Sequence, residues 1–196
     1  MRGTLKVGRD VFIDVGCVFE GRISLADGAH IGPYCVLRDS SVGAGTVLQA
    51  FSHLDGATIG AEAIIGPFAR LRPGAQLDDE VHIGNFVEVK ASHLERGTKA
   101  NHLAYVGNAH VGARSNIGAG TIFANYDGAN KHQSEVGANV HVGSNSVLVA
   151  PVRVGEGATI GAGSTVSGSV PPGKLTVARA KAVTIEGWRR AAKKTP

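Results

Sequence analysis

An all-β fold, built as a parallel solenoid of short strands, is the fold class that this sequence predicts. The first observation is a period of six residues: a large apolar residue returns at Ile13, Phe19, Leu25, Ile31 and Leu37. Neither a strand, with a period of two, nor a helix, with a period of about 3.6, gives this spacing. The second observation is composition. With 28 glycines and only 5% aromatic residues, thin layers of small aliphatic side chains are favoured over a thick core.

Each hexad is interpreted as one short strand followed by a corner, and three hexads close one coil of a triangular prism. The large apolar residue points inward, and small residues four places later, such as Cys35, Thr46 and Ala63, fit near the corners. Stacked coils lie about 4.8 Å apart, and the hexads suffice for about nine coils. This hexapeptide rule is typical of left-handed parallel β-helices, which are an exception to the right-handed crossovers of most parallel sheets.

The repeat divides the chain into a β-helix domain over 1–170 and a tail over 171–196. At four places the step between inward residues shortens from six to five, which indicates tightened corners. These steps are Leu37 to Val42, Leu54 to Ile59, Val89 to Leu94, and Val106 to Val111. A longer interruption, FANYDGANKHQSE over 123–135, is polar and contains glycine. We therefore expect a loop that protrudes from the prism there.

Charge and cysteine content limit the partners. The net charge of +4 and pI near 9.3 favour anions such as phosphates, and we expect neither nucleic acid nor a membrane as a partner. No apolar run approaches the roughly 20 residues of a membrane helix, and the N-terminus lacks the apolar stretch of a signal peptide. The two cysteines lack metal-ligand spacing, so we expect a cytoplasmic protein without a metal. Much of the positive charge lies in the tail, at Arg179, Lys181, Arg189, Arg190, Lys193 and Lys194.

The register predicts neighbours, because residues 18 apart in an unbroken stretch lie one coil apart on the same face. Cys17 and Cys35 form such a pair, and a disulfide could span the distance between them. In a reducing compartment we expect two small buried thiols instead.

Arg72 and Lys90 form a second pair 18 apart. Two cations about 5 Å apart repel each other unless an anion lies between them. They are either a phosphate clamp, with Arg72 as a planar fork, or two solvated side chains that lean apart. Among the eight histidines, His102 is the candidate for chemistry, because it lies about one coil beyond Lys90 in a hexad with Asn101 and Tyr105.

Several stretches outside the repeat carry a family resemblance. They are RLRPGA from Arg70, IGNFVEVK from Ile83, NHLAY from Asn101, NIGAGT from Asn116, NYDGANK from Asn125, LVAPV from Leu148 and EGWRR from Glu186. With these stretches the chain resembles, along nearly its whole length, the acetyltransferase domain of the bacterial bifunctional N-acetylglucosamine-1-phosphate uridyltransferase / glucosamine-1-phosphate N-acetyltransferase. That family's N-terminal nucleotidyltransferase domain, with its glycine-rich loop and Mg²⁺ site, is absent, so we expect no uridyltransferase activity.

The resemblance implies transfer of acetyl from acetyl-CoA to the 2-amine of glucosamine 1-phosphate, with His102 as the base that deprotonates the amine. It implies that Glu88 could orient His102, that a backbone N–H near Ala119 stabilises the oxyanion, and that no metal takes part. The substrate-binding residues that it implies are Arg72, Lys90, Tyr105, Asn116 and Lys131. The residues that it implies for acetyl-CoA are Ala119, Asn125, Tyr126, Ser144, Ala162 and Arg179.

The resemblance also implies a homotrimer with its sites between subunits. The product, N-acetylglucosamine 1-phosphate, would lead to UDP-N-acetylglucosamine for peptidoglycan and lipopolysaccharide. Three alternatives stay open at the level of the sequence. One is a β-helix acyltransferase with a different amine or hydroxyl acceptor. Another is a zinc hydratase with histidines that meet between subunits, and the third is a non-enzymatic solenoid that binds anions or proteins.

Overall fold

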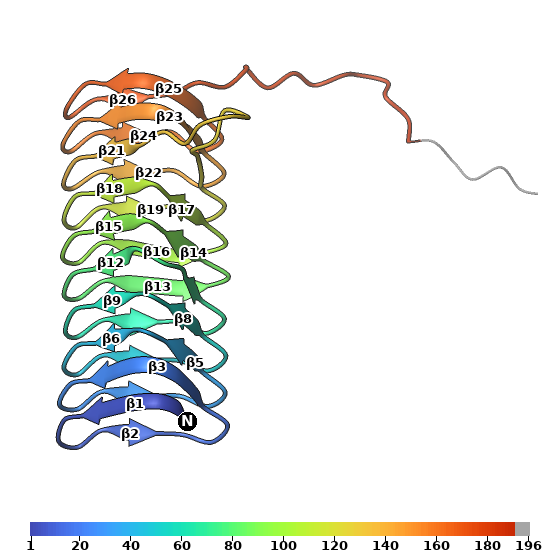
Figure 1. Ribbon diagram of the computed structural model, residues 1–196. Coiled ribbons are helices and arrows are strands. Elements are labelled where there is room, and N and C mark those ends of the chain that lie inside the picture. The colour runs from blue at the N-terminus through green and yellow to red at the C-terminus, as the bar shows by residue number, and fades with distance from the viewer. Residues whose placement is uncertain (191–196) are drawn as a thin grey trace, which may run out of the picture.

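The computed structural model describes residues 1–190, and most of them form a tall prism of stacked coils (Figure 1). Strands of neighbouring coils pair in parallel at equivalent positions, such as Leu71 with Val89 and Val89 with Val106. Residues 1–190 contain no helix, and therefore none that could span a membrane. The predicted left-handed parallel β-helix is confirmed.

The prism has three faces, which the chain visits in the order 1, 2, 3. Face 1 consists of β5 (Val36–Arg38), β8 (His53–Asp55), β11 (Arg70–Leu71), β14 (Glu88–Lys90), β17 (Tyr105–Gly107) and β20 (Ile122–Ala124). Face 2 consists of β6 (Ser41–Val42), β9 (Thr58–Ile59), β12 (Ala75–Leu77), β15 (Ser92–Leu94), β18 (Ala109–Val111) and β21 (Ser134–Val136). The longer strands β1 (Arg2–Val7), β3 (Val18–Leu25), β23 (Val147–Val154) and β25 (Thr165–Val170) continue from face 1 into face 2.

Face 3 is a separate sheet of ten strands. It consists of β2 (Phe12–Ile13), β4 (His30–Ile31), β7 (Val47–Leu48), β10 (Ile64–Ile65), β13 (His82–Asn85), β16 (Lys99–His102), β19 (Asn116–Ile117), β22 (His141–Val142), β24 (Thr159–Ile160) and β26 (Leu175–Thr176).

The core is a column of inward side chains, as the hexads predict. Leu37 and Leu71 are 0% exposed, and full burial of such a side chain is worth roughly 1.5–3 kcal/mol. The small residues near the corners are also buried, and their hydroxyls satisfy backbone groups of the next coil. Thr46 Oγ1 donates to the Gly60 carbonyl at 2.8 Å and accepts from the Ala63 N–H at 3.0 Å. The hydroxyls thereby link adjacent coils through the interior.

The shortened steps all lie at the corner between faces 1 and 2. Each contains a residue with positive φ, between 41° and 58°, at Asp39, Gly56, Ala91 or Asn108. Gly21 (69°) and Gly74 (80°) adopt the same region at this corner in six-residue steps, so a left-handed residue turns the chain there whether the step has five residues or six.

The loop is shorter than the sequence suggested. Phe123 and Ala124 belong to β20, and Phe123 is 0% exposed, while Ser134 and Glu135 belong to β21. Only residues 125–133 leave the prism, at the corner between faces 1 and 2. Phe123 lies six residues after Ile117 and so continues the inward register, which the polar residues that follow from Asn125 concealed.

The β-helix also extends beyond the predicted boundary at residue 170. After the turn at Pro171–Gly173, β26 pairs with β24 on face 3, and the tail begins only after Thr176. Ala178 and Arg179 still hydrogen-bond to the prism, through Ser164 Oγ and the Ala162 carbonyl. Beyond them the chain runs away from the prism (Figure 1), and Trp188 is 66% exposed. The predicted basic residues Lys193 and Lys194 lie outside the described residues. Cys17 and Cys35 are free thiols on adjacent coils.

Candidate active site

A vertical column of residues at the end of face 3 brings His102 into line with three of the residues expected to bind acetyl-CoA. The pairing of β16 with β19, β19 with β22 and β22 with β24 places His102, Ala119, Ser144 and Ala162 on successive coils. Backbone bonds confirm this order: the Asn145 N–H donates to the Ala119 carbonyl at 2.7 Å, for example. The side chain of Arg179 closes the column by donating to the Ala162 carbonyl.

Glycines allow the coils to approach closely beside this column. A Cβ at Gly84 would lie 1.9 Å from the Asn101 carbonyl oxygen, and a Cβ at Gly143 would lie 2.4 Å from the Ala162 nitrogen. Because the clashing atoms are backbone, no side-chain rotation could relieve the contact. The column therefore borders a strip of bare backbone.

His102 itself is exposed, and its Nδ1 lies 3.0 Å from Asn85 Oδ1. Glu88, which was expected to orient His102, is directed elsewhere. Its two carboxylate oxygens bind Arg72 at 2.8 Å and Arg70 at 3.3 Å. Glu88 starts face 1 rather than ending face 3, so its side chain lies around the corner from the imidazole. The expected contact between Glu88 and His102 is therefore not formed, and Asn85, which the sequence did not single out, contacts the imidazole instead.

Three cations converge at the opposite edge of face 1, where it meets the loop. Arg72 and Lys90 follow equivalent strand positions on adjacent coils, and Lys131 reaches them from the loop. The pKa of Lys90 is lowered, first by its contact with the Lys131 amine and by that group's charge, then by desolvation and by the charge of Arg72. Glu88 offsets only part of this repulsion. The Arg72–Lys90–Lys131 cluster is thus an electrostatic site that an anion would stabilise.

Tyr105 connects the two edges of face 1. It is three residues from His102, around the corner at Leu103, and its hydroxyl lies over Gly107, which pairs with Lys90. The Asn125 Nδ2 lies 3.5 Å from this hydroxyl and donates more closely to Asn108 Oδ1, at 2.7 Å. The tyrosine and Asn125 therefore form a polar floor between the histidine and the cations.

The loop is held in shape by its own aspartate. Asp127 Oδ1 accepts from the N–H groups of Ala129 and Asn130 at 2.8 and 2.7 Å, and Oδ2 lies 2.6 Å from His132 Nε2. These contacts hold the Asp127 pKa well below its usual range, with the Asn130 N–H as the largest cause. The backbones of Tyr126 and Lys131 pair across this turn in an isolated antiparallel β-bridge. Lys131 therefore extends from a hairpin of defined shape.

Asn116, a predicted substrate-binding residue, lies away from His102 and from the cation cluster. It starts β19 beside Lys99, at the other end of face 3 from His102. Its neighbours across the surface include His82, whose pKa is lowered by desolvation and by the charge of Lys99. Within one protomer, Asn116 is separated from the histidine by the width of the face.

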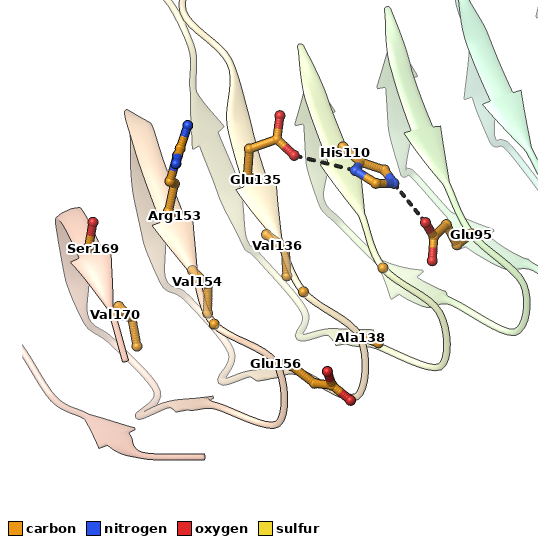
Figure 2. Close-up of a pocket in the computed structure, with 13 residues that line it drawn as sticks. Glu95, His110, Glu135, Val136, Ala138, Arg153, Val154, Glu156, Ser169 and Val170 are labelled. Carbon is orange, nitrogen blue, oxygen red and sulfur yellow. Dashed lines mark hydrogen bonds and ion pairs between the residues drawn. The ribbon is translucent and has the colours of Figure 1, made fainter. Parts of the chain in front are cut away.

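A groove on face 2 is the main alternative site, and Figure 2 shows its lining. His110 Nε2 lies 2.9 Å from Glu95 Oε1, and its Nδ1 lies 3.3 Å from Glu135 Oε2. Since both ring nitrogens face carboxylates, neither is free to act as a base. None of the predicted site residues lines this groove. Residues 1–190 contain no group of three or more His, Cys, Asp or Glu side chains placed to hold a metal ion.

Comparison with known proteins identifies relatives of this chain. A family model described as bacterial transferase hexapeptide (six repeats) matches residues 56–91 and 133–168. Bifunctional protein GlmU of Bordetella parapertussis is 58% identical over the whole chain, and bifunctional protein GlmU of Methylibium petroleiphilum is 64% identical over 99% of it. This chain is a relative of the C-terminal part of the GlmU proteins. It covers 43% and 42% of those two relatives, so it spans about two fifths of their length.

Among solved structures, UDP-N-acetylglucosamine O-acyltransferase (LpxA) from Moraxella catarrhalis is 21% identical, with a TM-score of 0.49 over 77% of this chain and 65% of that one. A likeness of this strength does not bear on function.

Proposed function

We propose that this chain transfers acetyl from acetyl-CoA to the 2-amine of glucosamine 1-phosphate. The observation that carries the proposal is the arrangement across face 1. A histidine with a free ring nitrogen lies at one edge, and a cluster of three cations lies at the other. High identity to the GlmU proteins supports the same reading, and the match to a bacterial transferase family supports group transfer as the reaction class.

The cation cluster is suited to the phosphate. Arg72 offers a planar fork, and Lys90 and Lys131 add point charges at the loop edge. Bound there, the sugar extends over Tyr105 and Asn125 and places its amine toward His102. The mutual repulsion of the cations, which lowers the Lys90 pKa, is relieved by the dianion.

His102 acts as the general base. Its Nε2 accepts a proton from the amine as the nitrogen attacks the thioester carbonyl. A C–N bond forms and the C–S bond breaks, and the imidazolium returns the proton to the departing thiolate of CoA. A backbone N–H at Ala119, one coil from His102, stabilises the oxyanion. Neither a covalent enzyme intermediate nor a metal has a role in this scheme.

The column of Ala119, Ser144 and Ala162 is proposed to bind acetyl-CoA along the prism. Its small side chains and adjacent glycines leave room for the pantetheine arm, and Arg179 at the end of the column suits a CoA phosphate. The loop residues Asn125 and Tyr126 lie at the corner between faces 1 and 2, away from this column, and in the proposed trimer they would approach the arm bound to a neighbouring subunit.

Asn116 lies at the far end of face 3 from His102, so in the proposed site it would come from a second copy of the chain, in a homotrimer with sites between subunits. Four aromatic rings form an exposed apolar ridge that a neighbouring subunit would bury. They are Tyr34, Phe51, Phe68 and Phe86, whose ring centroids stack 5.0–5.4 Å apart and whose side chains are about half exposed. The enzyme would act in the cytoplasm and supply N-acetylglucosamine 1-phosphate for UDP-N-acetylglucosamine, and so for peptidoglycan and lipopolysaccharide.

A panel of acceptors tests the proposed substrate. CoA release is measured with glucosamine 1-phosphate, glucosamine 6-phosphate and glucosamine. We expect glucosamine 1-phosphate to give a kcat/KM at least about 100-fold above glucosamine, because hydrogen bonds to charged groups contribute roughly 1.5–3 kcal/mol each. Equal rates with all three would point to another acceptor.

A further inference from the structure

The imidazole of His102 is held by one side chain, that of Asn85. The two residues are directly paired in the register of β13 and β16, and each is the last residue of its strand. His102 Nδ1 lies 3.0 Å from Asn85 Oδ1. The corner residues that follow have positive φ, 57° at Phe86 and 50° at Leu103, and the Leu103 N–H donates to the Asn85 carbonyl at 3.0 Å. The backbone pairing therefore fixes the positions of the Asn85 and His102 Cα atoms relative to each other.

This contact specifies where the imidazole carries its proton. A carboxamide oxygen can only accept a hydrogen bond, so the Nδ1 atom must be the donor. In the neutral ring the Nε2 atom then keeps its lone pair. The opposite tautomer would require the Asn85 carboxamide to turn over, so that its NH2 group and not its oxygen faces Nδ1.

We propose that Asn85 is a positioning residue that selects the Nδ1–H tautomer of His102 and so presents Nε2 as the base. The inference rests on the proposed role of His102. It concerns a residue that does not itself touch the substrate and acts only through the imidazole.

The neutral charge of Asn85 matters as well. Three other histidines among residues 1–190 face carboxylates: His93 faces Asp78, His110 faces Glu95, and His132 faces Asp127. A carboxylate stabilises the imidazolium and raises the pKa of the ring, whereas an amide orients the ring without adding charge. A base must be neutral at the working pH before it can accept a proton, so a neutral partner suits His102.

Two substitutions separate orientation from charge, with turnover of glucosamine 1-phosphate by the full chain measured across pH. Asn85→Ala removes the acceptor, and we expect kcat to fall about 10- to 100-fold, part of the usual contribution of a general base. Asn85→Asp keeps an acceptor and adds a charge. We expect it to retain more activity than Asn85→Ala at high pH and to move the acidic limb of the kcat/KM profile upward by about one pH unit or more.

The matched control is Asp78→Ala, which removes the 2.8 Å partner of His93 on face 2 and should leave rate and profile unchanged. Profiles of both Asn85 variants that superimpose on that of the unmodified chain would overturn the proposal.

A second measurement is independent of turnover. The ¹⁵N shifts of the His102 ring at neutral pH, assigned with His102→Gln, should show the proton on Nδ1, and Asn85→Ala should move it toward Nε2. A proton on Nε2 in the unmodified chain would overturn the Asn85 proposal. Activity that survives His102→Ala would instead contradict the proposed base, so the two failures are distinguishable.

Discussion

Lys90 shows at the scale of single residues how a stable prism can tolerate an unfavourable contact. Its ammonium group lies near the Lys131 ammonium group and the Arg72 guanidinium group, and the pKa of Lys90 is lowered as a result. A lysine placed only for stability would gain from a carboxylate neighbour, but the nearby Glu88 is engaged with Arg70 and Arg72. The repulsion is explained if the cluster binds an anion.

The Lys131→Ala variant tests this cluster. We expect the KM for glucosamine 1-phosphate to rise roughly 10- to 100-fold, the equivalent of one charged hydrogen bond, with a smaller change in kcat. In the unmodified chain, affinity should fall as pH rises through the depressed pKa of Lys90, because the amine then loses its charge. Removing Lys131 should move that loss to higher pH.

Lys6→Ala, on β1 near the N-terminus, is the control for a general loss of positive charge. Equal KM values for the Lys131 variant and the unmodified chain would contradict the phosphate assignment.

Register explains why some site residues could be found from the sequence and others could not. Arg72 and Lys90 are 18 apart and no shortened step lies between them, so their proximity was predictable. Asn85 and His102 are 17 apart because the step from Val89 to Leu94 falls between them. The pairing of Asn85 with His102 could have been predicted from the sequence by counting a coil of 17 residues, and not 18, across the shortened step.

Individual elements differ in how far they depend on the repeat. The strands follow the hexads, since each inward residue must stack on the coil below. The loop over 125–133 has no such constraint and is shaped instead by local bonds to Asp127. Its boundaries were therefore misjudged from composition, and its position above Lys90 could not be derived from periodicity.

Asp127→Ala should loosen the loop without unfolding the prism. We expect a higher KM for the acceptor and faster proteolytic cleavage within 125–133, with little change in the melting temperature, because the loop packs outside the core. Asp127→Asn keeps an acceptor for the two N–H groups and should have a smaller effect. A variant with unchanged KM and protease resistance would show that the loop does not need this aspartate.

The sign of the pH effect on the loop follows from the depressed pKa of Asp127. The ionised carboxylate supports the hairpin fully above the ordinary pKa of an aspartate. That support is lost only as pH falls through the lower pKa of the folded state. The loop should therefore keep its shape through mildly acidic conditions.

At the scale of the whole molecule, the position of Asn116 relative to His102 bears on how the site is assembled. The sequence predicted the prism well, because the hexads alone define three faces. The same register places His102 two residues after the inward Ala100 and Asn116 one residue before the inward Ile117, at opposite ends of face 3, although their nearness along the chain suggested proximity. In the proposed function, a site that uses both residues draws them from two chains.

Co-expression of two impaired variants tests a shared site. Chains with His102→Ala and Asn116→Ala, each carrying a different tag, are purified as mixed oligomers. Each variant alone should be nearly inactive, while mixed trimers should recover activity in about a third of their sites, since a closed ring of three that contains both chains has one interface that pairs an intact His102 with an intact Asn116. Absence of recovery in mixed trimers would contradict a site shared between subunits.

The central claim is that His102 is the base of an acetyl transfer to glucosamine 1-phosphate. The most direct measurement is CoA release from acetyl-CoA and this acceptor by the unmodified chain and by His102→Ala, with the oligomeric state of both determined by light scattering. The account predicts rapid release that falls at least about 100-fold in the variant while the oligomer is unchanged. Release that continues undiminished in the variant, or none from the intact oligomer, would contradict it.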